Sequence, residues 1–95
     1  MNDLNSVIIQ GTVKEDAEVS VSRRNTVKCS FPLIYTKSNS QARSNTFTFS
    51  VVVKGESAAL YKDHLKKGSM IRMVGELREK NGQVIIVADH LSLKI

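Results

Sequence analysis

The chain has 95 residues, of which 41% are hydrophobic, and its 14 Lys and Arg against 9 Asp and Glu give a formal net charge of +5. This length predicts one small domain over residues 1–95, and the composition is that of a folded protein rather than a disordered one. No apolar run approaches the roughly 18 residues of a membrane span, so we expect no membrane partner. The first residues lack the basic and apolar regions of a secretory signal, which predicts a cytoplasmic location.

Two strands are predicted in the first third of the chain. Residues 6–13 form the first, and Gly11 within it marks a bend of the kind that small barrels need at their corners. Residues 26–35 form the second, because their apolar side chains alternate with period two. Pro32 cannot donate a hydrogen bond to a neighbouring strand, so we expect this strand to be exposed or bulged there.

A polar loop and a third strand follow. Residues 37–45 show no periodicity, which indicates a flexible loop. Residues 46–54 alternate again, and we expect Phe47 and Phe49 to lie in the core or in a subunit interface. Lys54 should face the other way.

The second half of the chain predicts one helix and two more strands. The helix covers residues 56–67, with Ser57 as its N-cap and a glycine stop after it. The strands are residues 69–77 and 83–88, joined by a tight Asn-Gly hairpin. Three strands, a helix and two strands predict an all-β fold with one helix. It is the OB fold, a five-stranded Greek-key barrel with the helix between the third and fourth strands.

Nothing in the sequence indicates catalysis or metal binding. His64 and His90 have no Cys or carboxylate partners at ligand spacing. The chain also lacks a phosphate-binding glycine loop, a pair of acids on a strand end and a Ser/His/Asp arrangement. We therefore expect neither an enzyme nor a bound cofactor. The one cysteine, Cys29, lies among alternating apolar residues and should be a small buried hydrophobe.

Six stretches, in order along the chain, match the pattern of a known family. They are residues 5–13, 16–19, 31–33, 51–55, 65–69 and 74–78. Together they resemble the opening strand, acidic turn, second strand, third strand, helix-end turn and fourth strand of bacterial single-stranded DNA-binding proteins. The most specific part is Val51-Val52-Val53-Lys54-Gly55 followed by Leu65-Lys66-Lys67-Gly68-Ser69. No one stretch is diagnostic, but the ordered set covers essentially the whole chain.

This resemblance implies a function. Members of the family coat single strands during DNA replication, recombination or repair, using a basic groove for the phosphates and aromatic side chains on which bases stack. The implied partners are single-stranded DNA, further copies of the chain in a homotetramer or homodimer, and replication or repair proteins. The implied location is the cytoplasm, at the nucleoid.

The chain departs from the family in its stacking residues. The positions that usually carry aromatic rings correspond here to Asn39, Thr48 and Lys54, and the chain has no tryptophan. The last hairpin is short, and the family's acidic C-terminal tail is not part of these 95 residues. These features leave open a trimmed chain or a specialised relative of the primosomal PriB type. With stacking weakened, binding should rest on phosphate contacts and fall steeply with salt.

A basic segment supplies the candidate site. Residues 23–54 contain no acid, which suits a polyanion. The residues that we expect to line the groove are Lys28, Tyr35, Lys37, Arg43, Lys54 and Arg72. Lys54 is the strongest candidate because it occupies a family contact position. Tyr35 is the expected stacking residue, and we expect it to point away from the face of Phe31 and Leu33 if the strand has no bulge.

Two functions remain open from the sequence. The first is non-specific binding of single-stranded DNA. The second is an OB-fold adaptor that dimerises and binds other proteins, as in a primosome, with weak or incidental DNA binding. The missing aromatic residues favour the adaptor, whereas the basic segment favours DNA binding.

Overall fold

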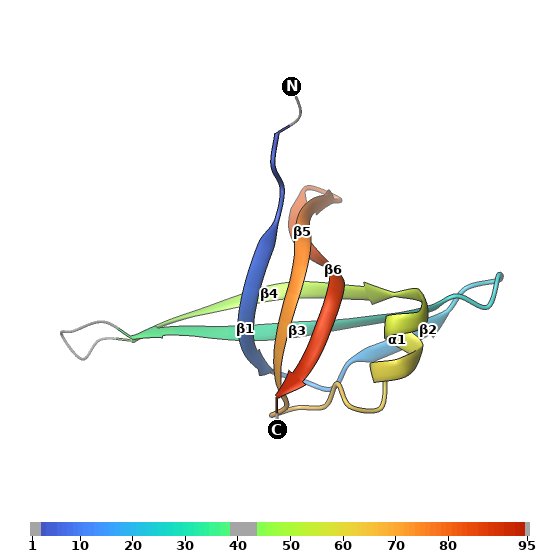
Figure 1. Ribbon diagram of the computed structural model, residues 1–95, viewed down its shortest axis with the longest axis horizontal. Coiled ribbons are helices and arrows are strands. Elements are labelled where there is room, and N and C mark those ends of the chain that lie inside the picture. Colours follow the sequence, from blue (N-terminus) through green and yellow to red (C-terminus); the bar gives the residue numbers. More distant parts are fainter. Residues whose placement is uncertain (1–2, 39–43, 95) are drawn as a thin grey trace.

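The computed structural model describes residues 3–38 and 44–94. Within these residues the chain forms β1 (Val7–Val13), β2 (Glu18–Val21), β3 (Val27–Ser38), β4 (Ser44–Lys54), α1 (Gly55–Tyr61), β5 (Met70–Lys80) and β6 (Gln83–Lys94). All the strands belong to one curved sheet, and α1 lies beside the end of it that carries β2 (Figure 1). None of the helical segments in this part of the chain is long and apolar enough to cross a membrane.

The sheet closes on itself as a barrel of five strands. The strand order is β1-β5-β6-β4-β3, and β1 then pairs with β3 through Thr12 opposite Ile34 and Val13 opposite Leu33. The pairs are antiparallel except for β4 with β6, which run parallel. This architecture confirms the predicted barrel with one helix.

Two glycines make the close strand contacts that the barrel needs. A Cβ atom on Gly11 would lie 2.4 Å from the carbonyl oxygen of Ile34, and one on Gly75 would lie 2.3 Å from that of Val87. The pairing of β5 with β6 also shifts register between Val74 and Gly75. A strand that bends this sharply against its neighbour has no room for a side chain, so the predicted bend at Gly11 is confirmed.

One predicted turn is partly a strand. Residues 16–19 were expected to form an acidic turn, and Asp16 and Ala17 lie outside the strands, but Glu18 and Val19 belong to β2 (Glu18–Val21), which pairs with the first residues of β3 outside the barrel. The prediction was wrong for these two residues because β3 begins several residues before it enters the barrel, and its free edge there accepts a partner. With this strand counted, the helix falls between β4 and β5 rather than between the third and fourth strands.

The helix is shorter than predicted. It ends at Tyr61 instead of residue 67, and it begins at Gly55 with Lys54 at the N-cap position, so Ser57 is not the cap. After Tyr61 the chain turns, and Leu65 becomes fully buried in the core. The carbonyl oxygen of Leu65 accepts a hydrogen bond from the amide of Ala17 at 2.9 Å. Burying Leu65 against the barrel therefore outweighs continuing the helix.

The barrel interior is apolar. Its largest fully buried side chains are Leu33, Leu65, Ile71, Met73, Ile86, Val13, Val51, Val53 and Cys29. Cys29 confirms the prediction of a buried hydrophobe, with its Sγ 3.6 Å from the carbonyl oxygen of Ala58. Burial raises the pKa of the Cys29 thiol, so this group stays protonated and unreactive.

We expected β3 to be exposed or bulged at Pro32, and it has no bulge there. Its pairing with β4 continues unbroken through Pro32 opposite Ser50, and Pro32 is half-buried. On the other side of β3, Pro32 falls between the last residue paired with β2, Ser30, and the first residue paired with β1, Leu33. The missing N–H therefore costs no strand pairing there.

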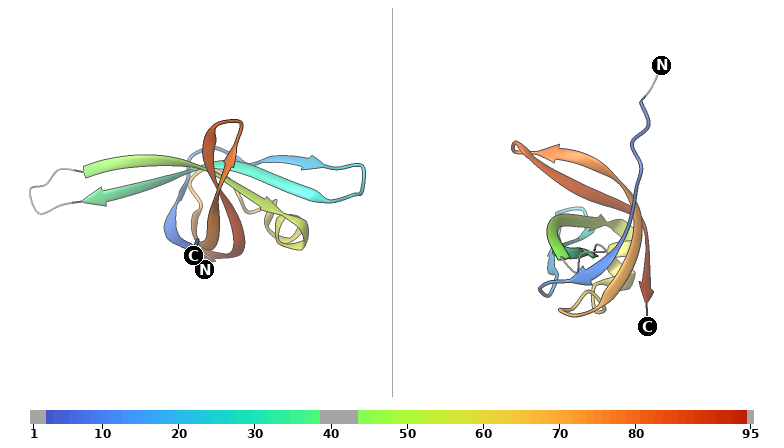
Figure 2. Two further views of the ribbon diagram at one scale, coloured as in Figure 1. Left: turned by 90° about the horizontal axis from the view of Figure 1, so that it is seen from above. Right: turned by 90° about the vertical axis from the view of Figure 1, so that its left-hand side faces the viewer.

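Besides the β2–β3 hairpin, two hairpins project from the barrel (Figures 1 and 2). The first, which we call the arm, consists of residues 35–38 and 44–47, beyond the last pair between β1 and β3. Both ends of the predicted polar loop thus belong to strands, while its centre, including Asn39 and Arg43, lies outside the described residues. The second, which we call the finger, is residues 76–87. Its turn confirms the predicted hairpin, since Asn81 and Gly82 both have positive φ, 52° and 80°.

Candidate nucleic-acid interface

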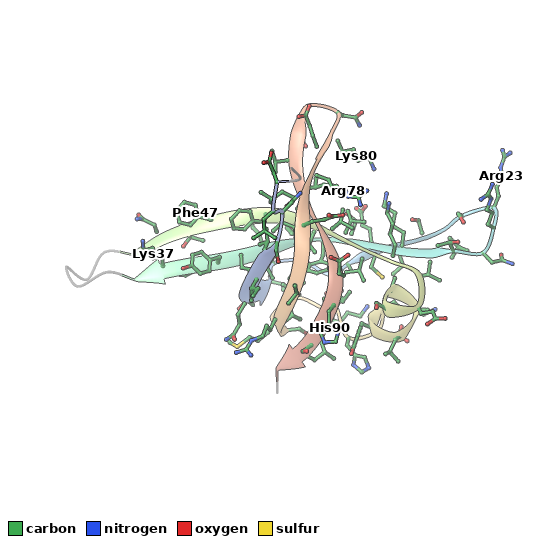
Figure 3. All side chains as sticks on the ribbon, turned by 45° about the horizontal axis from the view of Figure 1, so that its top comes forward. Arg23, Lys37, Phe47, Arg78, Lys80 and His90 are labelled. Atoms are coloured by element: carbon green, nitrogen blue, oxygen red, sulfur yellow. The ribbon has the colours of Figure 1, made fainter. Side chains whose placement is uncertain are left out.

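A basic hollow lies in the angle between the finger and the outer face of β3 and β4. Lys28 and Lys54 stand directly opposite one another in the register of β3 and β4. The hollow has a volume of about 200 Å³, and its lining residues are Lys28, Val52, Lys54, Arg78, Glu79, Lys80, Ile85 and Val87. Figure 3 shows Arg78 and Lys80 on the finger, and Lys37 and Phe47 far from them on the arm.

The floor of the hollow is apolar because the finger covers the sheet. Val52 is on the outer face of β4, yet only 6% of its surface is exposed. Its partner in the parallel register is Val87 of β6, and Ile85 follows on the same face. Val52 points outward but is buried, so the lysines are attached beside an apolar surface.

Like charges crowd the hollow. The neighbouring ammonium group of Lys80, followed by burial and the charge of Lys54, holds the pKa of Lys28 below its usual value. Arg78 is balanced by Glu76, since its Nε donates to Glu76 Oε1 at 2.8 Å and its Nη2 donates to the same oxygen. An anion placed among the lysines would relieve this repulsion.

The structure brings together two of the predicted site residues and adds two others. Lys28 and Lys54 share the hollow, and Lys54 faces away from the buried Val51 and Val53, as predicted. Sequence analysis missed Arg78 and Lys80. Their alternation just before the Asn-Gly turn was a usable signal, because it puts both on one face of a hairpin that folds over the sheet.

Tyr35 and Lys37 lie on the opposite face of the ribbon from the hollow. The prediction that Tyr35 points away from Leu33 was wrong, because residues an even number apart on an unbulged strand share a face. Tyr35 is paired with Phe47, their ring centroids 6.2 Å apart and their planes at 27°. Phe47 is 46% exposed, so it belongs to the surface of the arm and not to the core. Lys37 is two residues further along the same face and is exposed.

Arg72 is remote from the hollow. Its Nη2 donates to Gln10 Oε1 at 3.3 Å on the outer face of β1 and β5. Arg78 is on the same strand, and six residues at about 3.3 Å each put the two arginines about 20 Å apart. The predicted residues therefore do not form one patch, because they occupy the hollow, the arm and this third position.

An acidic hollow flanks the outer face on its other side. Its lining residues are Glu15, Asp16, Glu18, Ser30, Phe31, Pro32 and Ser50. Asp16 has a structural role, since its Oδ1 accepts a hydrogen bond of 2.8 Å from the amide of Lys67. In the part of the chain that the structure describes, no three His, Cys, Asp or Glu side chains are placed to hold a metal ion. The three carboxylates make this hollow negative, in contrast to the basic one.

The family assignment follows the pattern of the sequence. The model of the single-strand binding protein family matches residues 4–88, and the chain belongs to this family. No curated protein matches the sequence at a significant level.

Solved structures share the fold. The single-stranded DNA-binding protein from Thermus aquaticus superimposes with a TM-score of 0.83 at 23% identity, over 97% of this chain and 50% of that chain. A deletion mutant of the same protein gives a TM-score of 0.76 at 20% identity, covering 97% of this chain and 51% of the mutant. The protein priB from Ralstonia solanacearum gives 0.78 at 18% identity, over 97% of this chain and 100% of that chain. The chain therefore spans about half the length of the Thermus proteins.

Proposed function

We propose that this chain binds single-stranded DNA without sequence preference, as one domain over residues 1–95. The observation that carries the proposal is the basic hollow on the outer face of an OB barrel in a chain of the single-strand binding protein family. The strands of this fold are a common oligonucleotide-binding surface. The chain acts in the cytoplasm, at the nucleoid, in replication, recombination or repair, with no catalysis and no cofactor.

A single strand would follow the outer face of β3 and β4. Its phosphates bind the lysines of the hollow, and the exposed Thr46 and Thr48 of β4 offer hydrogen bonds farther along. The strand then reaches the arm, whose reverse face adds the charge of Lys37 and the aromatic surface of Tyr35 and Phe47. Arg43, outside the described residues, stays a candidate contact. Since no ring lines the hollow itself, affinity rests on phosphate contacts.

Self-association is part of the proposal. Among the described residues, β1 has a paired strand on one side only until Thr12, where β3 joins it. An open strand edge is a template for a second strand. Ile8 on this strand is 73% exposed, which is unusual for a large apolar side chain in a monomer. Two copies joined along β1 would cover it, as a homodimer or as half of a homotetramer.

A second candidate function is an adaptor that binds replication or repair proteins. One observation favours it, because the exposed aromatic pair of the arm lies on the opposite face from the lysines. Rings and phosphate-binding groups then serve different surfaces, and Phe47 with Tyr35 suits a protein partner. The match over the full length of a priB protein is consistent with this function.

Fluorescence anisotropy with labelled oligo-dT and a matched duplex tests the proposal at low and moderate salt. We expect a preference for the single strand that falls with salt, and a large loss for Lys54→Glu. Lys66→Glu is the matched control, because Lys66 is exposed outside the hollow. No binding at low salt, or equal loss in both variants, would refute DNA binding through the hollow and leave the adaptor function.

A further inference from the structure

The charge of the basic hollow does not match an internal phosphate of a DNA strand. Four basic groups, those of Lys28, Lys54, Arg78 and Lys80, stand against the carboxylates of Glu79 in the lining and Glu76 on Arg78. The site thus has two uncompensated positive charges. An internal phosphodiester has only one negative charge, so it would leave part of the repulsion in place.

A phosphate at the end of a strand fits better. A phosphomonoester has a charge between about −1.5 and −2 at neutral pH and three strong acceptor oxygens. Each lysine ammonium has three donors and no acceptor, so three lysines from three strands can share one such group. The crowding that lowers the pKa of Lys28 shows that the cluster is short of negative charge.

The position of the hollow also suits a chain end. Lys54 is the last residue of β4, and its pair with Lys28 is the first of the β3–β4 ladder, so the outer face of this ribbon ends there. The finger rises at the same point and supplies five of the lining residues, which are Arg78, Glu79, Lys80, Ile85 and Val87. The end of a DNA strand that runs along this ribbon therefore fits into the hollow.

The hollow is large enough for more than the phosphate. Its volume of about 200 Å³ is several times the roughly 30 Å³ that one water occupies in the liquid. The floor of Val52, Ile85 and Val87 is apolar, which suits the sugar carbons of a terminal nucleotide. We propose that the basic hollow binds the terminal phosphomonoester of a nucleotide, so that the protein prefers single strands with a phosphorylated end. This inference rests on the proposed function, since the preferred ligand is a DNA strand.

The test compares short oligo-dT of one length with a 5′-phosphate, a 3′-phosphate or no phosphate, by competition against a labelled strand. We expect one phosphorylated form to bind about tenfold more tightly than the unphosphorylated form, the amount that added charge-assisted hydrogen bonds provide. Lys80→Gln should remove this preference, so that phosphorylated and unphosphorylated strands bind this variant equally and both more weakly than they bind the unmodified protein. Lys66→Gln should keep the preference. Lys54→Gln is the second variant, and melting by circular dichroism shows that each variant is folded.

The outcomes separate this inference from the proposed function. Binding of oligo-dT with no effect of either phosphate overturns the inference and leaves the proposed function standing. A preference that persists in both Lys80→Gln and Lys54→Gln also overturns it. Binding of thymidine 5′-monophosphate alone shows whether the hollow recognises a free nucleotide or the end of a DNA strand. If it binds in the absence of any oligo-dT binding, the hollow is a site for a free nucleotide and the proposed function is wrong. If neither it nor any strand binds, both are wrong.

Discussion

Neutralising two lysines of the hollow should change the salt dependence of DNA binding by a predictable amount. Each phosphate contact to a single strand contributes about −0.7 to the slope of log affinity against log salt, so the three lysines of the hollow give about −2.1, with Arg78 left out because Glu76 balances its charge. Raising salt from about 50 to about 200 mM should then weaken binding about 18-fold. With Lys28 and Lys54 both changed to Gln, one contact remains, the slope falls to about −0.7, and the same change of salt weakens binding only about threefold.

The assay is anisotropy of labelled oligo-dT over a series of salt concentrations. The matched control changes Lys62 and Lys66 to Gln, because both are exposed at the helix end, outside the hollow. This control removes the same net charge without touching the proposed contacts. We expect its slope to equal that of the unmodified protein within the contribution of one contact.

Two results would contradict phosphate binding by Lys28 and Lys54. If the Lys28 and Lys54 variant keeps the full slope, these lysines do not contact phosphates. If the Lys62 and Lys66 control loses as much slope as the hollow variant, net charge governs binding and no defined site exists. In either case the geometry of the hollow would not explain affinity.

Four further predictions concern single residues. Lys28→Gln should raise the melting temperature at neutral pH, because the folded protein lowers the pKa of Lys28; the gain should vanish above the unfolded value of about 10.5, where the unfolded chain also loses this proton. Glu18→Gln should tighten oligo-dT binding about twofold, the effect of one repulsive charge at about 10 Å in water, and unchanged affinity would place the DNA elsewhere. Gly75→Ala should cost about 1–3 kcal/mol in urea unfolding, since its Cβ would collide with a carbonyl oxygen of β6; an unchanged midpoint would contradict the tight contact. Tyr35→Ala should weaken binding of long oligo-dT and spare short strands that reach only the hollow, and a loss at all lengths would put Tyr35 in the main contact surface.

Much of the fold could be predicted from the sequence, because the sequence signals for it are local. Alternating apolar residues marked the barrel strands, Gly11 marked a corner, and the Asn-Gly pair marked the finger turn. These features depend on side-chain period and backbone conformation, which nearby residues set. The helix end was misjudged for the opposite reason, since burial of Leu65 depends on the shape of the barrel and not on helix propensity.

Only part of the candidate site could be predicted from the sequence. The sequence alone determined that the side chain of Lys54 lies on the opposite face of β4 from those of Val51 and Val53, because alternation along one strand needs no other information. Only the tertiary structure decided that Lys28 stands opposite Lys54, that Val52 is buried under the finger, and that Arg78 and Lys80 close the hollow. Those contacts join residues far apart in the chain, and their register follows from how the barrel closes and how strongly the finger twists, which no short segment encodes.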